Sequence, residues 1–300
     1  MSSVSLFLIC TLIWSSTWLA ITFQLGTVAP EASVAYRFAL AAALIGAICV
    51  ATRRSLRLPL RIHALLVAQG VLFFGLNYIA IYRAEQYVAS GLVAVLFSTI
   101  VFMSLIGTRF TFGTPITARA LAGAALGVGG VALLFLPDLI AMPMDGDAAL
   151  GVFFGIGGTL LATGGNLVSM RLQRLHQPII ETTAWGMGYG ALVAGITATL
   201  GGVTWSFDPR VGYLASLAYL AVFGSVIAFL AYLTLLRQVG AGPASYVGVA
   251  TPVLAMLFST ALEGYRWSVA GIVGVALAVA GNVLVLSATR RRRAASAPPR

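Results

Sequence analysis

Apolar residues in this chain gather into long, continuous runs that short polar segments separate. A helix needs about 20 consecutive apolar residues to cross a bilayer, and ten runs approach that length. They cover residues 4–23, 32–50, 62–82, 88–108, 116–136, 148–170, 179–201, 211–233, 242–262 and 267–288. Because the runs are continuous rather than alternating, they predict an all-α integral membrane protein with ten transmembrane helices and argue against a membrane β-barrel.

Composition and charge narrow the class of protein. Hydrophobic residues make up 60% of the chain and charged residues only 9%, whereas soluble domains carry about 25% charged residues. The net charge of +10 could indicate a nucleic-acid partner, but all 18 basic residues are arginines that cluster between the apolar runs. We therefore expect the lipid bilayer around the protein and no nucleic acid as a partner. Cys10 and Cys49 lie inside apolar runs, so we predict no disulfide framework, metal site or cofactor.

The sequence repeats itself at about half its length. A shift of 151 residues places six residues of segment 123–133 on identical residues of 274–284, and a shift of 152 does the same for five residues of 89–105 on 241–257. Such repetition at a fixed spacing indicates a duplicated unit. Five helices are an odd number, so the second unit enters the membrane upside down. Inverted repeats of this kind are typical of transporters, whose substrate site lies between the halves near the bilayer midplane.

This repeat sets the predicted organisation of the chain. We expect two inverted five-helix repeats around a central cavity, at 1–137 and 148–288, joined by an external linker at 138–147. A basic cytoplasmic tail, expected to be disordered, follows at 289–300.

Arginines are distributed unevenly over the two sides of the predicted bundle. When the N-terminus is placed in the cytoplasm, fourteen arginines fall on the cytoplasmic side and only Arg83, Arg210 and Arg266 on the other. Acidic residues show the reverse, with only Glu181 of eight on the cytoplasmic side. Because basic residues near helix ends are retained in the cytoplasm, we predict a multi-pass protein of a bacterial-type plasma (inner) membrane with both termini cytoplasmic.

Several motifs follow one another in a recognisable order. They are LIWSSTW at Leu12–Trp18, YRFALAAALI at Tyr36–Ile45, GAALGVGGVALL at Gly123–Leu134 and TPVLAMLFSTALEGYRW at Thr251–Trp267. In their order and spacing, over nearly the whole length, the chain resembles the drug/metabolite transporter superfamily, and within it the ten-helix EamA-type exporters. It departs from the pattern at Ile100, where the second half has Pro252. The resemblance, which is greatest to the aromatic amino acid exporter branch, implies export of amino acids or similar small metabolites.

Arg37 is the ionised residue that lies well inside an apolar run. A charge at the centre of a membrane helix costs about 2.5–3.5 kcal/mol on insertion scales, so such residues usually face a cavity or a partner. Arg37 could be structural, reaching toward the interface or binding helix carbonyls to lock the halves together. If instead it faces the cavity, its planar guanidinium suits a carboxylate.

Polar and aromatic residues at similar depth in other helices are further candidates for a substrate-binding cavity. The full candidate set is Trp14, Thr17, Trp18, Arg37, Asn77, Tyr78, Tyr82, Ser98, Thr99, Asn166, Tyr246 and Thr251. Trp14 and Trp18 share a helix face because they are four residues apart, and Asn166 follows Thr17 by 149 residues. Any one of them could instead be an interhelical hydrogen bond, worth about 0.6 kcal/mol. Together they indicate a neutral, polar and aromatic lining for a small amphipathic solute.

Pro252 lies inside an apolar run, where it removes a backbone hydrogen bond. It could be a gating bend, since a freed carbonyl is tolerated where it lines a water-filled cavity, or a static kink.

The absence of certain residue types at membrane depth distinguishes between the remaining classes of function. None of the eight carboxylates lies at mid-depth, so we expect a facilitative or exchange exporter working by alternating access, without carboxylate-driven proton antiport. The alternative is a multidrug or other metabolite or nucleotide-related efflux carrier with ion coupling. Enzymes need paired acids, a metal motif or a nucleophile with its base, and channels need rings of charge or carbonyl filters; neither pattern is visible. We expect no enzyme, neutral amino acids as solutes, and a monomer or weak dimer.

Overall fold

The computed structural model describes residues 1–300 except residues 89, 142–145, 264–267 and 297–300. The predicted linker and tail, and Arg266, fall partly or wholly on these excepted residues. Within the described part of the chain, every regular element is a helix. The first half consists of α1 (Ser3–Thr22), α2 (Pro30–Ala51), α3 (Leu60–Gln69), η1 (Gly70–Gly75), α4 (Leu76–Tyr87), α5 (Ser90–Ser98), α6 (Ile100–Phe112) and α7 (Ala118–Leu134).

A short helix, α8 (Leu136–Ala141), connects this half to the next one. The second half consists of α9 (Gly146–Arg174), α10 (Ile179–Leu200), α11 (Val211–Tyr219), η2 (Leu220–Ile227), α12 (Ala228–Val239), α13 (Ala241–Ser245), α14 (Val247–Glu263) and α15 (Val269–Ser296). Among the described residues, six helical stretches are long and apolar enough to cross a membrane, and α7 and Val269–Val285 are shorter apolar helices. The protein is therefore an all-helical, multi-pass membrane protein.

The C-terminal helix is longer than the sequence indicated. Helix α15 continues through the arginine cluster to Ser296, so the expectation of a disordered segment is wrong for residues 289–296. Alanine and arginine dominate this stretch, and both are good helix formers.

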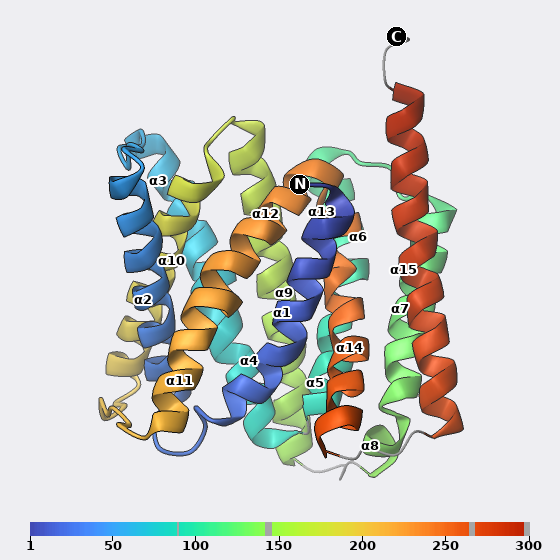
Figure 1. The fold of residues 1–300 in the computed structure, drawn as a ribbon, viewed down its shortest axis with the longest axis horizontal. Coiled ribbons are helices and arrows are strands. Elements are labelled where there is room, and N and C mark those ends of the chain that lie inside the picture. The colour runs from blue at the N-terminus through green and yellow to red at the C-terminus, as the bar shows by residue number, and fades with distance from the viewer. Residues whose placement is uncertain (89, 142–145, 264–267, 297–300) are drawn as a thin grey trace.

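Several helices that pack against each other run in opposite directions (Figure 1). Helix α1 begins, and α15 ends, at one end of the molecule, here called the terminal face. Helix α2 runs toward the terminal face and packs against α10, which runs away from it. Helices α7 and α15 form a second antiparallel pair. The centre of the bundle is built by α1, α4, α9, α12 and α14, with α1 against α12 and α14, and α4 against α9.

Glycines let α7 and α15 approach until their backbones touch. A Cβ atom added to Gly130 would lie 2.5 Å from the backbone nitrogen of Ala278 and 2.5 Å from the carbonyl oxygen of Gly274. Small residues at such crossings permit the close packing that drives helix association in membranes.

A π-helical segment interrupts the third helix of each half. Segment η1 separates α3 from α4, and η2 separates α11 from α12. Each contains a Phe-Gly pair, Phe74–Gly75 in η1 and Phe223–Gly224 in η2. Such segments occur frequently at functional sites, because they displace backbone groups from the regular hydrogen-bond pattern.

Candidate functional site

A cavity of about 100 Å³ lies at the centre of the bundle between the two halves. Its lining consists of Trp14, Thr17, Ile21, Arg37, Phe73, Asn77, Tyr78, Ile81, Ala94, Phe97, Ile100, Asn166, Phe229, Tyr232, Ser245, Gly248, Thr251 and Pro252. Both halves of the chain contribute to this wall.

Many of the residues that the sequence singled out meet at this cavity. They are Trp14, Thr17, Arg37, Asn77, Tyr78, Asn166, Thr251 and Pro252. They come from α1, α2, α4, α9 and α14. Trp18 belongs to α1, but its side chain lies outside the described residues. Helix packing thus gathers polar groups that are up to 238 residues apart in the sequence, from Trp14 to Pro252.

Arg37 is the charged residue of the described lining. Its side chain is 1% exposed, and its Nε donates a 2.9 Å hydrogen bond to Oγ of Ser225 in η2. The guanidinium carbon lies 4.7 Å from the ring centre of Tyr78 and 5.3 Å from that of Phe38, within the range of a cation–π interaction. Nη1 has no hydrogen-bond partner among the described residues.

The π segment η2 makes room for this arginine. A Cβ atom at Gly224 would lie 3.1 Å from Nη2 of Arg37 and 3.0 Å from Cγ2 of Thr17. The carbonyl oxygen of Gly224 accepts a 3.0 Å hydrogen bond from the indole nitrogen of Trp14. Segment η2 therefore fixes one lining residue from α1 and one from α2.

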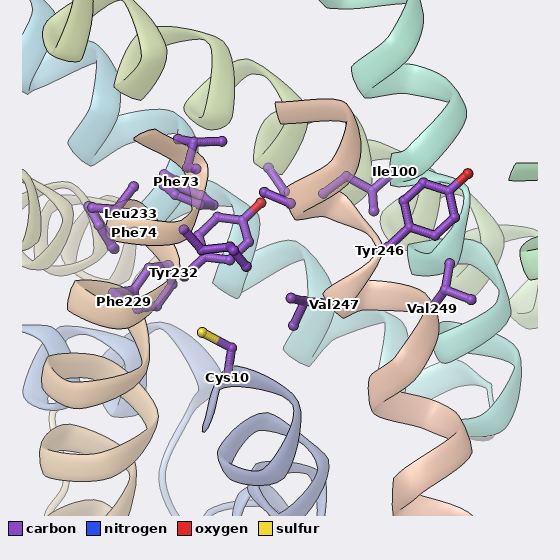
Figure 2. Close-up of a cluster of buried hydrophobic side chains, with 14 of the residues drawn as sticks. Cys10, Phe73, Phe74, Ile100, Phe229, Tyr232, Leu233, Tyr246, Val247 and Val249 are labelled. Atoms are coloured by element: carbon purple, nitrogen blue, oxygen red, sulfur yellow. The ribbon is translucent and has the colours of Figure 1, made fainter. Parts of the chain in front are cut away.

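Aromatic rings form much of the remaining wall. Trp14 lies 5.1 Å from Phe229 and 5.2 Å from Tyr232 between ring centres, and Phe73 lies 5.2 Å from Phe229. Figure 2 shows Phe73, Phe229 and Tyr232 gathered on one side of the cluster. Edge-to-face and tilted pairs at these distances are favourable. They give the cavity a rigid apolar surface.

Two asparagines add neutral hydrogen-bonding groups. Asn77 donates to the carbonyl oxygen of Phe73 at 3.3 Å, which leaves its Oδ1 without a partner. Asn166 is fully buried on α9, and neither its Oδ1 nor its Nδ2 has a partner among the described residues. Buried polar atoms are normally paired with protein, water or ligand. These atoms line the cavity and are available to what fills it.

Pro252 places an additional backbone acceptor in the wall. Without an N–H, it cannot donate to the carbonyl of Gly248, four residues earlier on α14, and both residues line the cavity. The hydroxyl of Thr251 is occupied by the carbonyl oxygen of Val247 at 2.8 Å. The start of α14 thus combines a small residue, a polar residue and a proline at the cavity wall.

Other predicted residues lie outside the lining. Oη of Tyr82 donates to Oε1 of Gln24 at 3.1 Å. Ser98 and Thr99 donate to the carbonyl oxygens of Val95 and Leu96 in α5 at 2.7 and 2.5 Å. Tyr246 points away from Phe73, Phe229 and Tyr232 (Figure 2), and its hydroxyl donates to the carbonyl oxygen of Ala120 on α7 at 3.1 Å.

Several lining residues were not singled out by the sequence. Phe73, Phe97, Phe229 and Tyr232 supply most of the additional aromatic surface. Aromatic residues are also common in the protein core, so their residue type carried no signal of their position. Ile100 is different, because the 152-residue shift pairs it with Pro252 and both line the cavity.

Known proteins match this chain over nearly its whole length. The EamA-like transporter family matches twice, at residues 1–136 and 149–287. The chain is 28% identical over 283 residues to the uncharacterized inner membrane transporter YedA of Escherichia coli, covering 91% of this chain and 89% of that protein. It is 24% identical over 249 residues to the uncharacterized transporter YoaV of Bacillus subtilis, covering 83% and 84%. One crystal structure shares the fold with a TM-score of 0.78 at 20% identity, covering 97% of this chain and 98% of the other.

Proposed function

Since the chain belongs to the EamA-like transporter family, we propose that it exports amino acids or similar small metabolites across the inner membrane by alternating access. The protein is a multi-pass membrane transporter, and two of its relatives are named as transporters. The observation that carries the proposal is the buried cavity between the halves, with unpartnered atoms of Arg37, Asn77 and Asn166. A packed scaffold would not leave such groups unpaired.

The proposed mechanism requires ten spans arranged as two inverted repeats. The sequence shift, the antiparallel α2–α10 and α7–α15 pairs, and the π segment in the third helix of each half support this arrangement. In such transporters one repeat rocks against the other around a fixed central site. We assign the gating bend to Pro252, because it interrupts the hydrogen bonding of α14 at the cavity wall.

The proposed orientation places both termini in the cytoplasm. The arginine-bearing connections α2–α3, α6–α7 and α9–α10 lie at the terminal face. The end of α4, which carries Arg83, and the start of α11, which Arg210 precedes, lie toward the opposite end. The positive-inside rule assigns the arginine-rich face to the cytoplasm.

Counterflow in liposomes tests the transport proposal directly. Purified protein is reconstituted into vesicles loaded with one neutral amino acid, and uptake of labelled solute is measured against a panel of aromatic, aliphatic and cationic compounds. We expect saturable counterflow down a solute gradient with no imposed pH gradient. Flux that does not saturate would indicate a channel, and strict dependence on a pH gradient would contradict facilitated exchange.

The ion-coupled alternative has one supporting observation. Oε1 of Glu85, toward the end of α4, is buried without a hydrogen-bond partner. If proton coupling operates through this carboxylate, Glu85→Gln should abolish uptake driven by a pH gradient. Under the proposal made here, counterflow by the Glu85→Gln variant stays close to that of the wild type.

A further inference from the structure

The cavity holds a cation for which the protein supplies no counter-ion. The ion pairs of the described residues are Arg54–Glu181, Arg83–Glu31 and Arg210–Asp208. Arg37 takes part in none of them, and no Asp or Glu belongs to the cavity lining given by the described residues. A buried charge that is left unpaired is strongly unfavourable. The occupant of the cavity is therefore expected to carry the missing negative charge.

The geometry of Arg37 suits a bound carboxylate. Its Nε is occupied by Ser225, and its guanidinium carbon lies 4.7 Å from the ring centre of Tyr78 and 5.3 Å from that of Phe38. Nη1 remains free, and it belongs to a side chain that lines the cavity and is 1% exposed. A guanidinium that is fixed in this way binds carboxylates in a defined orientation, which a flexible ammonium does not do.

The described lining of the cavity offers no charged partner for the ammonium group of a ligand. Its free acceptors are neutral, namely the amide oxygens of Asn77 and Asn166 and the carbonyl oxygen of Gly248 that Pro252 cannot bind. The remaining wall includes six aromatic residues, whose rings suit the flat apolar body of another ring.

From these observations we infer that the cavity binds a small aromatic monocarboxylate, with its carboxylate on Arg37 and its ring against Trp14, Phe73 and Phe229. An α-amino group is not required for binding, and a compound with an ammonium but no carboxylate is rejected. This inference rests on the proposed function, since it assigns the substrate class to the same cavity. The inference goes beyond the proposed function because it expects a carboxylate without an amino group to bind at least as tightly as an amino acid.

Three compounds with the same phenyl ring separate the charges. They are 3-phenylpropionate with a carboxylate, phenylalanine with both groups, and phenethylamine with an ammonium. Their dissociation constants are measured on the purified full chain in detergent by isothermal titration calorimetry. We expect 3-phenylpropionate to bind at least as tightly as phenylalanine, and phenethylamine to show no binding. Tighter binding of phenethylamine than of 3-phenylpropionate, binding of phenylalanine alone, or no binding of any compound overturns the inference.

Substitution of the arginine gives an independent measurement. Arg37→Gln should weaken 3-phenylpropionate binding about 10- to 100-fold, as expected for loss of a charged hydrogen-bond partner, and Arg37→Lys should fall in between. Arg57→Gln is the matched control, because it removes the same charge from an exposed position, and should leave the affinity unchanged. Unchanged affinity in Arg37→Gln overturns the inference.

The compound ranking on the wild-type protein decides the inference even if Arg37→Gln fails to fold. Counterflow of the same compounds in liposomes then separates the two proposals. Binding with the expected ranking but without counterflow would remove the transport proposal and leave the carboxylate site in place.

Discussion

The indole nitrogen of Trp14 donates a 3.0 Å hydrogen bond to the carbonyl oxygen of Gly224. This bond links α1 of the first half to the π segment η2 of the second half. Ser225, the next residue of η2, binds Nε of Arg37 at 2.9 Å. The π segment therefore orients two cavity residues from the other half, which explains why an irregular helical turn lies at this depth.

Removing the indole donor should weaken this link. Trp14→Phe keeps an aromatic ring but leaves the carbonyl of Gly224 without its partner, so we expect a loss of about 1 kcal/mol, in the range measured for interhelical hydrogen bonds in membranes. The measurement is the midpoint of thermal unfolding in detergent. Trp205→Phe is the control, because Trp205 is 46% exposed and donates a 3.3 Å bond to Thr199. An equal effect of both variants would contradict the role of the Trp14 bond.

Two neighbouring glycines of α7 should respond oppositely to alanine. At Gly130 a Cβ would meet the backbone of α15 at 2.5 Å, whereas at Gly129 nothing lies within 4 Å. Because backbone cannot move aside as a side chain does, Gly130→Ala should cost at least about 1–3 kcal/mol. Gly129→Ala should be neutral or stabilising by up to about 1 kcal/mol through helix propensity. Resistance of both variants to unfolding by SDS compares them, and similar midpoints would argue against the close crossing.

The helical class could be predicted from sequence because a bilayer requires long apolar runs, and six helical stretches of the described residues are long and apolar enough to span. The π segments that interrupt these helices could not be predicted from the sequence. Segment η1 lies within an apolar stretch of leucine, phenylalanine and glycine that is equally compatible with a regular helix. The segment packs closely against α10, where a Cβ at Gly70 would lie 2.8 Å from the carbonyl oxygen of Gly186.

The residues that line the cavity could likewise be predicted only in part from the sequence. Tyr78 and Tyr82 are four residues apart and share a helix face, yet Tyr78 lines the cavity and Tyr82 binds Gln24. Spacing defines which residues share a face, but not which neighbouring segment covers each turn of it. Arg37 was identifiable because a charge at membrane depth is rare, whereas Phe229 resembles any core phenylalanine until the fold is known.

A loop outside the membrane-spanning helices contains a charge pair with a defined pH dependence. Asp208 accepts hydrogen bonds from the backbone N and Nε of Arg210, whose Nη2 also reaches Thr27 between α1 and α2. The hydrogen bond from the Arg210 side chain, followed by that from its backbone, lowers the pKa of Asp208 below its usual value. Because the carboxyl is more acidic in the folded protein, its stabilisation is complete above the unfolded pKa of about 3.9 and is lost as pH falls through the lowered pKa.

Asp208→Asn should therefore lower the unfolding midpoint slightly and by a constant amount between about pH 5 and 8. The difference from the wild type should shrink on acidification below about pH 4. A series of thermal unfolding curves in detergent at stepwise pH measures it. A difference that grows toward low pH would have the wrong sign for a lowered pKa and would exclude this origin.

Pro252 provides the sharpest test of a moving helix. Pro252→Ala restores an N–H that can bond to the carbonyl of Gly248, so α14 should straighten and the protein should become more stable. If the bend is part of alternating access, the straightened helix disfavours one of the two states, and the maximal rate of counterflow should fall several-fold while solute affinity changes little. Pro243→Ala in α13 is the matched control, because Pro243 lies outside the cavity lining, and should leave the rate unchanged. A Pro252→Ala variant that is more stable and transports at the wild-type rate would show that the kink is static, and alternating access would then require a hinge elsewhere, such as the π segments.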